Sequence, residues 1–107
     1  MGLFNTVAAT LTCPKCGVSS EVRVQFKYGQ TWQYDYKLGE RLRWGKPQRG
    51  EAGCAEVVVN GVDICPACKD EWDLYVFVSH DVLDSVRFAD GTHDFFGTGE
   101  TFIVLMA

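Results

Sequence analysis

The sequence lacks several features that would assign a function at once. It has no apolar run of membrane-spanning length, and its first residues do not combine the basic and apolar segments of a secretion signal. It also contains no G-x-S-x-G, no phosphate-binding glycine loop and no H-E-x-x-H, and it has only two histidines. These absences predict a cytoplasmic protein that does not engage membranes and is not an enzyme.

The sequence also lacks any sustained 3.6-residue periodicity, and it therefore predicts little or no helix. Polar and apolar residues alternate instead along residues 21–28 and 31–38, with the apolar residues at even numbers. We expect these two runs to pair as a hairpin around Gly29, with Tyr28 opposite Trp32, because this register aligns their apolar faces.

A valine-rich stretch precedes the second cysteine pair. Within it, Asn60-Gly61 is a favoured two-residue turn and predicts a hairpin of residues 57–59 and 62–64. The returning strand of this hairpin would lead directly into Cys65.

The remaining segments also read as strands and turns. Residues 72–78 and 82–88 predict a further hairpin, and residues 101–106 predict a final strand buried on both faces. A short strand is expected around residues 41–44. The glycine-rich segment at about residues 45–54 is expected to be a flexible loop.

Charge is distributed unevenly along the chain. The formal net charge of −4 argues against a protein that binds DNA through bulk positive charge. Residues 1–49 contain eight Lys and Arg against three acidic residues, whereas residues 50–107 contain two against eleven. Either strands from the two halves pair and neutralise each other, or two patches of opposite sign serve different partners.

Four of the five cysteines form two Cys-Pro-x-Cys knuckles, which are followed by Gly17 and Lys69. Paired thiolates are the ligands of a tetrahedral zinc ion, and four of them leave no open coordination position for catalysis. We therefore expect a single β domain over residues 1–107, an antiparallel sheet of hairpins that includes a zinc ribbon. One structural Zn²⁺ is expected to be bound by Cys13, Cys16, Cys65 and Cys68.

Other interpretations of the four cysteines stay open. Iron could occupy the same four-sulfur site, the thiols could be redox-active pairs, or they could be reduced and buried without a metal. Because no secretion signal accompanies the CxxC pairs, a reducing compartment is expected.

Aromatic and basic residues interleave between the knuckles. Such a pattern can stack nucleobases and contact phosphates, although aromatic residues at even positions of a strand are also typical of a core. The candidate binding face consists of Trp32, Tyr34, Lys37, Arg41, Arg43, Trp44, Lys46 and Arg49.

Several segments resemble a group of small, mostly uncharacterised bacterial and phage-associated proteins similar to zinc ribbons. The similar segments are Gly2-Leu3-Phe4-Asn5-Thr6-Val7 before a CPxCG knuckle, the stretch over residues 26–34, Arg41-Leu42-Arg43-Trp44-Gly45, and a second knuckle after a valine-rich stretch. The resemblance implies a metal-stabilised fold and an accessory or interaction role, without a named activity.

The sequence therefore leads to three functional hypotheses. The first is a non-enzymatic module that binds another protein and is built on a zinc-braced sheet. The second is a module for single-stranded RNA that uses residues 32–49, and the third is a CxxC thiol oxidoreductase.

Overall fold

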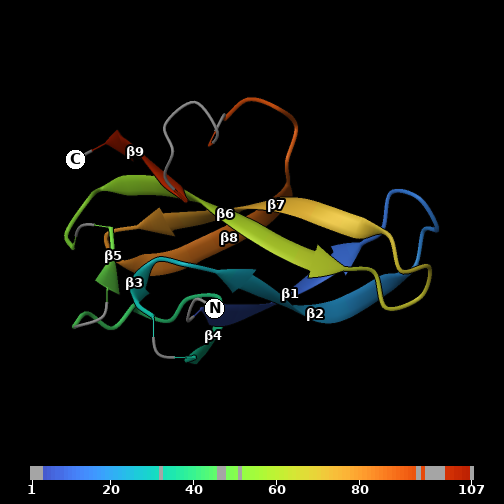
Figure 1. Ribbon diagram of the computed structural model, residues 1–107, viewed down its shortest axis with the longest axis horizontal. Coiled ribbons are helices and arrows are strands. Elements are labelled where there is room, and N and C mark those ends of the chain that lie inside the picture. The colour runs from blue at the N-terminus through green and yellow to red at the C-terminus, as the bar shows by residue number, and fades with distance from the viewer. Residues whose placement is uncertain are drawn as a thin grey trace.

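The protein is mainly β, as the sequence predicts, in a computed structural model that describes residues 4–31, 33–45, 48–50, 52–93, 95 and 101–106 (Figure 1). Among these residues, no helix is long and apolar enough to cross a membrane. The strands of the described part are β1 (Asn5–Thr12), β2 (Ser19–Phe26), β3 (Gly29–Gln30), β4 (Asp35–Lys37), β5 (Gln48–Arg49), β6 (Glu56–Ile64), β7 (Glu71–Ser79), β8 (Val82–Phe88) and β9 (Phe102–Met106).

One curled sheet contains most of these strands. Its order is β4-β1-β2-β6-β7-β8, and β9 pairs with the first half of β6. The pairings are antiparallel except that of β1 with β4, which is parallel. β3 and β5 form a separate two-stranded sheet.

The curl of the sheet encloses the hydrophobic core. β1 buries its odd-numbered residues and β2 its even-numbered residues, as expected for strands with one face on a core. In Figure 1, β1 and β2 lie below β6, β7 and β8, and side chains from both groups of strands fill one cluster. The central members of this cluster are Val7, Val24, Phe26, Val57, Val59, Leu74, Val76 and Leu83.

Each cysteine knuckle lies at the tip of an antiparallel arm. β1 and β2 pair as far as Thr12 and Ser19, on either side of the first knuckle, and β6 and β7 pair as far as Ile64 and Glu71, on either side of the second. This arrangement of two arms confirms the expected ribbon layout.

The predicted hairpin of β7 and β8 is also confirmed. Ser79 pairs with Val82, and the two residues between them, His80 and Asp81, have φ angles of +49° and +65°. Positive φ at both central positions is the geometry of a tight hairpin turn.

The predicted turn at Asn60-Gly61 was wrong. Both residues lie inside the continuous strand β6, where Asn60 pairs with Tyr75 and Gly61 with Leu74. A Cβ atom on Gly61 would lie 2.7 Å from Val24 Cγ1 and 3.1 Å from Val76 Cγ2. The glycine therefore permits β2 to approach β6 closely, and it does not serve a turn.

The predicted hairpin of residues 21–28 and 31–38 was also wrong. β2 pairs with β1 and β6, and the chain after β2 forms β3 and then β4, which runs parallel to β1. The buried side chain of Asn5 fixes this path: its Nδ2 donates to the carbonyls of Tyr28 (3.2 Å) and Gln30 (2.9 Å), and its Oδ1 accepts from the Tyr34 amide (3.1 Å).

Three further expectations need correction. The last strand is not buried on both faces: only its start packs on the core, through Phe102 against Tyr28, and its last three residues are exposed. Arg41 forms an isolated bridge with Val82 in place of a strand over residues 41–44. The expected loop at residues 45–54 contains β5, and residues 46, 47 and 51 lie outside the described part.

We expect Gly61→Ala to destabilise the protein by about 1–3 kcal/mol, because the new methyl group would overlap Val24 in a packed core. Thermal or denaturant unfolding measures the change. In a Val24→Ala background the same substitution should cost clearly less. Equal costs in the two backgrounds would contradict close packing of β2 on β6 at this residue.

We expect Asn5→Ala to lower the free energy of unfolding by about 2–4 kcal/mol, because it leaves two carbonyls and one amide near the core without their partner. Urea unfolding measures this loss. Thr10→Ala, an exposed change on the same strand, is the control and should stay near the wild type. An equal effect of both variants would argue against the role given to Asn5.

Candidate metal centre

The four knuckle cysteines meet at the tips of the two arms. Their sulfur atoms all lie within 4.8 Å of one another, with 3.7 Å between the Sγ atoms of Cys13 and Cys68 and 3.7 Å between those of Cys16 and Cys65. A tetrahedral ion with metal–sulfur bonds of about 2.3 Å needs neighbouring sulfurs about 3.8 Å apart. The observed spacing therefore fits a four-thiolate site for one metal ion.

The backbone closes both knuckles in the same way. The amide of Cys13 donates to the Val18 carbonyl at 3.0 Å, and the amide of Cys65 donates to the Asp70 carbonyl at 2.8 Å. These equivalent bonds join each first cysteine to the residue five positions later. The two turns therefore present their thiols as two similar pairs.

The residue after each second cysteine has a left-handed conformation. Gly17 has φ of +76° and donates its amide to the Cys13 carbonyl, and Lys69 has φ of +63° and donates to the Cys65 carbonyl. Glycine adopts this conformation without steric cost, whereas lysine does not. The second knuckle thus has the same geometry as the first, and Lys69 carries the strain.

Backbone amides around the sulfurs stabilise thiolates on the first cysteine of each knuckle. The Cys16 amide, followed by that of Lys15, lowers the pKa of Cys13 to about 6 against desolvation. The Cys68 amide, 3.5 Å from the Cys65 sulfur, likewise lowers the pKa of Cys65. Such N–H groups also disperse the charge of a metal-bound thiolate.

The second cysteine of each knuckle has a raised pKa, in contrast to the first. The amides of Val18 and Asp70 act to lower the pKa values of Cys16 and Cys68, but desolvation and the neighbouring thiols outweigh them. The pKa of Cys16 is raised, and that of Cys68 is raised to about 12. Four thiols this close favour shared protons until a cation neutralises them.

The surroundings leave the cluster only partly open to solvent. Cys13 and Cys65 are buried, Cys16 and Cys68 are exposed, and Lys15 lies 4.0 Å from Asp70 across the two knuckles. With four sulfurs as ligands, the coordination shell of a bound ion would be complete. The arrangement suits holding the arms together and leaves no position for a substrate.

Cys54, the fifth cysteine, is buried in the hydrophobic core.

The structure divides the candidate binding face between the core and the surface. Tyr34 and Trp44 are half-buried and pack against the core, Trp44 through an edge contact with Tyr28. The guanidinium of Arg43 lies 4.7 Å from the centre of the Tyr34 ring. Arg43 therefore covers one face of the Tyr34 ring, and Trp44 is partly covered by the core.

The basic residues of this face that are described point outward. Lys37, Arg41 and Arg43 are exposed, on β4 and on the irregular segment that follows it. Trp32, Lys46 and the side chain of Arg49 lie outside the described residues, and the predictions on them stay predictions.

An apolar groove that the sequence analysis missed lies beside the metal centre. Val62 and Ile64 are 42% and 52% exposed on the outer face of β6, the face turned away from the core. The groove has a volume of about 290 Å³ and is lined by Gln25, Val62, Asp63, Ile64, Glu71, Trp72 and Asp73. The alternation of Val62 and Ile64 along a single strand was its signal, and the assumed turn at Asn60-Gly61 obscured it.

We expect Cys65→Ser, or removal of metal by a chelator, to loosen or unfold the domain, because ligation energy contributes directly to folding. Thermal unfolding of the metal-loaded protein measures the effect, with Cys54→Ser compared for its metal content. Cys65→Ser should lose the metal, whereas Cys54→Ser should keep it. Unchanged melting after metal removal would contradict a structural role for the centre.

The chain matches no protein-family model, no curated protein and no solved structure. The capacity to hold a metal ion therefore rests on the chain itself: four thiols at tetrahedral spacing, two equivalent turns and amides directed at the sulfurs.

Proposed function

We propose that this protein is a non-enzymatic protein-interaction module whose sheet is held in shape by one structural Zn²⁺ on Cys13, Cys16, Cys65 and Cys68. The observation that carries the proposal is the four-sulfur cluster at the tips of both arms. A complete thiolate shell is typical of structural zinc, and the soft ligands also explain why iron is the competing ion.

The proposed contact surface is the groove beside the metal centre. Val62 and Ile64 expose apolar area there, and the backbone strand that carries Trp72 borders the groove. A partner that covers the two aliphatic side chains would remove this apolar area from water.

The acidic lining of the groove defines the chemistry of the partner. Asp63, Glu71 and Asp73 contribute three carboxyl groups, and burial raises the pKa of Asp63. A basic side chain placed beside an apolar one would complement these groups, because a cation relieves the cost of a half-buried carboxylate. The proposed partner is therefore a protein segment with both apolar and basic residues.

Single-stranded RNA is the alternative partner. It is favoured by the exposed Lys37, Arg41 and Arg43, and disfavoured by the packing of Tyr34 and Trp44 on the core. Thiol oxidoreductase chemistry has less support. The four sulfurs form one cluster, in which all lie within 4.8 Å of one another, whereas CxxC redox chemistry needs a separate pair of thiols within one knuckle.

The resemblance to the small bacterial and phage-associated proteins with zinc ribbons agrees with this proposal. A reducing cytoplasm is the compartment in which four free thiols would remain available to zinc.

We expect Ile64→Arg to abolish recovery of a specific partner by the zinc-loaded protein, because it places a cation on the apolar and acidic groove. Affinity capture followed by cross-linking mass spectrometry measures this. Val104→Arg, a similarly exposed valine on β9, is the matched control and should retain the partner.

The same experiment separates the two partners. Recovery that survives Ile64→Arg, is lost in the double variant Arg41→Ala and Arg43→Ala, and disappears after ribonuclease treatment would replace the protein partner with RNA. Elemental analysis that finds iron in place of zinc would correct the metal without changing the contact surface.

A further inference from the structure

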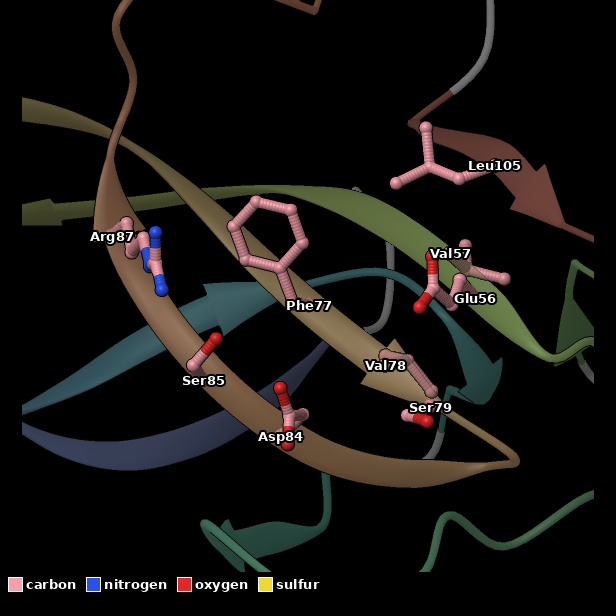
Figure 2. A pocket seen from close by; sticks show the side chains of 9 residues that line it. All are labelled: Glu56, Val57, Phe77, Val78, Ser79, Asp84, Ser85, Arg87 and Leu105. Carbon is pink, nitrogen blue, oxygen red and sulfur yellow. The ribbon is translucent and has the colours of Figure 1, made fainter.

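A second hollow lies on the outer face of the sheet, at the other end of β6 from the metal centre. Its volume is about 260 Å³, and Figure 2 shows its side chains arriving from four neighbouring strands. β6 contributes residues 56–57, β7 residues 77–79, β8 residues 84, 85 and 87, and β9 residue 105. The full lining is Glu56, Val57, Phe77, Val78, Ser79, Asp84, Ser85, Arg87 and Leu105.

The pocket coincides with two irregularities of the sheet. The register of β7 against β8 shifts between Phe77 and Val78, which leaves Asp84 as an extra residue on β8. The register of β6 against β9 shifts between Glu56 and Val57, which leaves Leu105 as an extra residue on β9. Bulges of this kind redirect side chains and recur beside binding sites. Both extra residues line this one pocket.

The charged groups of the pocket form few ion pairs or side-chain hydrogen bonds with other described residues. Within the described ranges, neither Glu56 nor Asp84 has an ion pair or a side-chain hydrogen bond. Arg87 lies with its guanidinium carbon 5.9 Å from the centre of the Phe77 ring, and no ion pair within 4.0 Å joins it to either carboxylate. Two carboxylates and the Ser79 and Ser85 hydroxyls thus remain available as acceptors.

We infer that this pocket binds one primary ammonium group at the end of an aliphatic chain, the chemistry shared by a lysine side chain and a small free alkylamine. The two carboxylates and the hydroxyls would accept from the ammonium, and Phe77 and Leu105 would pack on the methylene groups. A volume of about 260 Å³ suits a ligand of side-chain size.

Arg87 would set the charge that the pocket accepts. The two carboxylates and the guanidinium together carry a formal charge of −1. One ammonium group would therefore bring the net charge of the pocket to zero, and a second positive charge would make it positive. The pocket should therefore prefer a monoamine to a diamine, and Arg87 is the residue that makes this distinction.

The inference does not depend on the proposed function. The pocket lies at the Glu56 end of β6 and the metal centre at the Ile64 end, about 26 Å apart along an extended strand of this length. Between them, the Tyr75 hydroxyl bonds to the backbone of His93, which brings the chain after β8 across this face. Pocket variants should therefore leave metal content unchanged, so the two ideas can fail separately.

The test is an NMR titration of the metal-loaded protein with N-acetyl-lysine methylamide, and with N-acetyl-norleucine methylamide as the probe that lacks the ammonium. We expect the lysine probe to shift the amides of residues 56–57, 77–79, 84–87 and 105, with binding that weakens as salt increases. The norleucine probe should shift them at least fivefold less at equal concentration. Equal shifts from both probes, or shifts elsewhere only, would overturn the inference.

Three pocket variants and one control variant test which residues form the binding site. Glu56→Gln and Asp84→Asn should each weaken lysine binding by about two- to fivefold, as expected for exposed charge pairs. Glu21→Gln, an equal charge change at an exposed position on β2, should leave it unchanged. Arg87→Gln should strengthen binding of butylamine, and should strengthen binding of putrescine more. A control that weakens binding as much as the pocket variants would reduce the effect to net charge and overturn the site.

The same titration identifies the source of the ammonium group. Butylamine binding as tightly as a lysine-containing tripeptide would indicate a free amine as the ligand. A tripeptide that binds about tenfold tighter would indicate the side chain of a partner protein, through added backbone contacts. Absence of saturation by all of these amines would overturn the inference.

Discussion

The structure depends on the contact between β2 and β6, because in the described part of the chain the backbone ladder between the two arms has only two residue pairs, Gln25 with Val62 and Phe26 with Gly61. Beyond these pairs the arms are held by side-chain packing in the curl and by the cysteines at their tips. The angle between the arms is therefore fixed at two places, a crossing at Gly61 and a cluster of four sulfurs. Both the groove and the metal centre follow from this geometry.

The sequence predicted the parts of this structure that depend on local chemistry. The spacing within each CxxC knuckle, the alternation along the strands and the hairpin of residues 72–78 and 82–88 are properties of short segments, and the structure agrees with them. The strand partners could not be predicted in this way. Asn60-Gly61 has the composition of a turn, yet its glycine is required by a side chain of β2 that is distant in sequence. Asn5 gave no signal, since its role appears only when residues 28, 30 and 34 surround it.

The contrast in charge between the two halves persists in the folded protein. One of the two ion pairs among the described residues lies within the first half, between Arg23 and Asp35, and the other joins the knuckles through Lys15 and Asp70. Because the ladder between the halves is short, few of their charges come into register. The exposed Arg41 and Arg43 thus belong to the first half of the chain, and the carboxyl groups of Glu71 and Asp73 beside Ile64 belong to the second half.

The arrangement of the knuckles also has a consequence for the order of folding. Each arm is a hairpin whose strands are close in sequence. The two cysteines of its knuckle can therefore come close together early in folding and at little entropic cost. Joining the pairs closes a loop over residues 17–64, which is the slow, long-range step. A metal ion bound first by the two thiols of one knuckle would complete its coordination shell only when the second knuckle arrives. Binding of the second pair of thiols, in place of water, would then be the last event of folding.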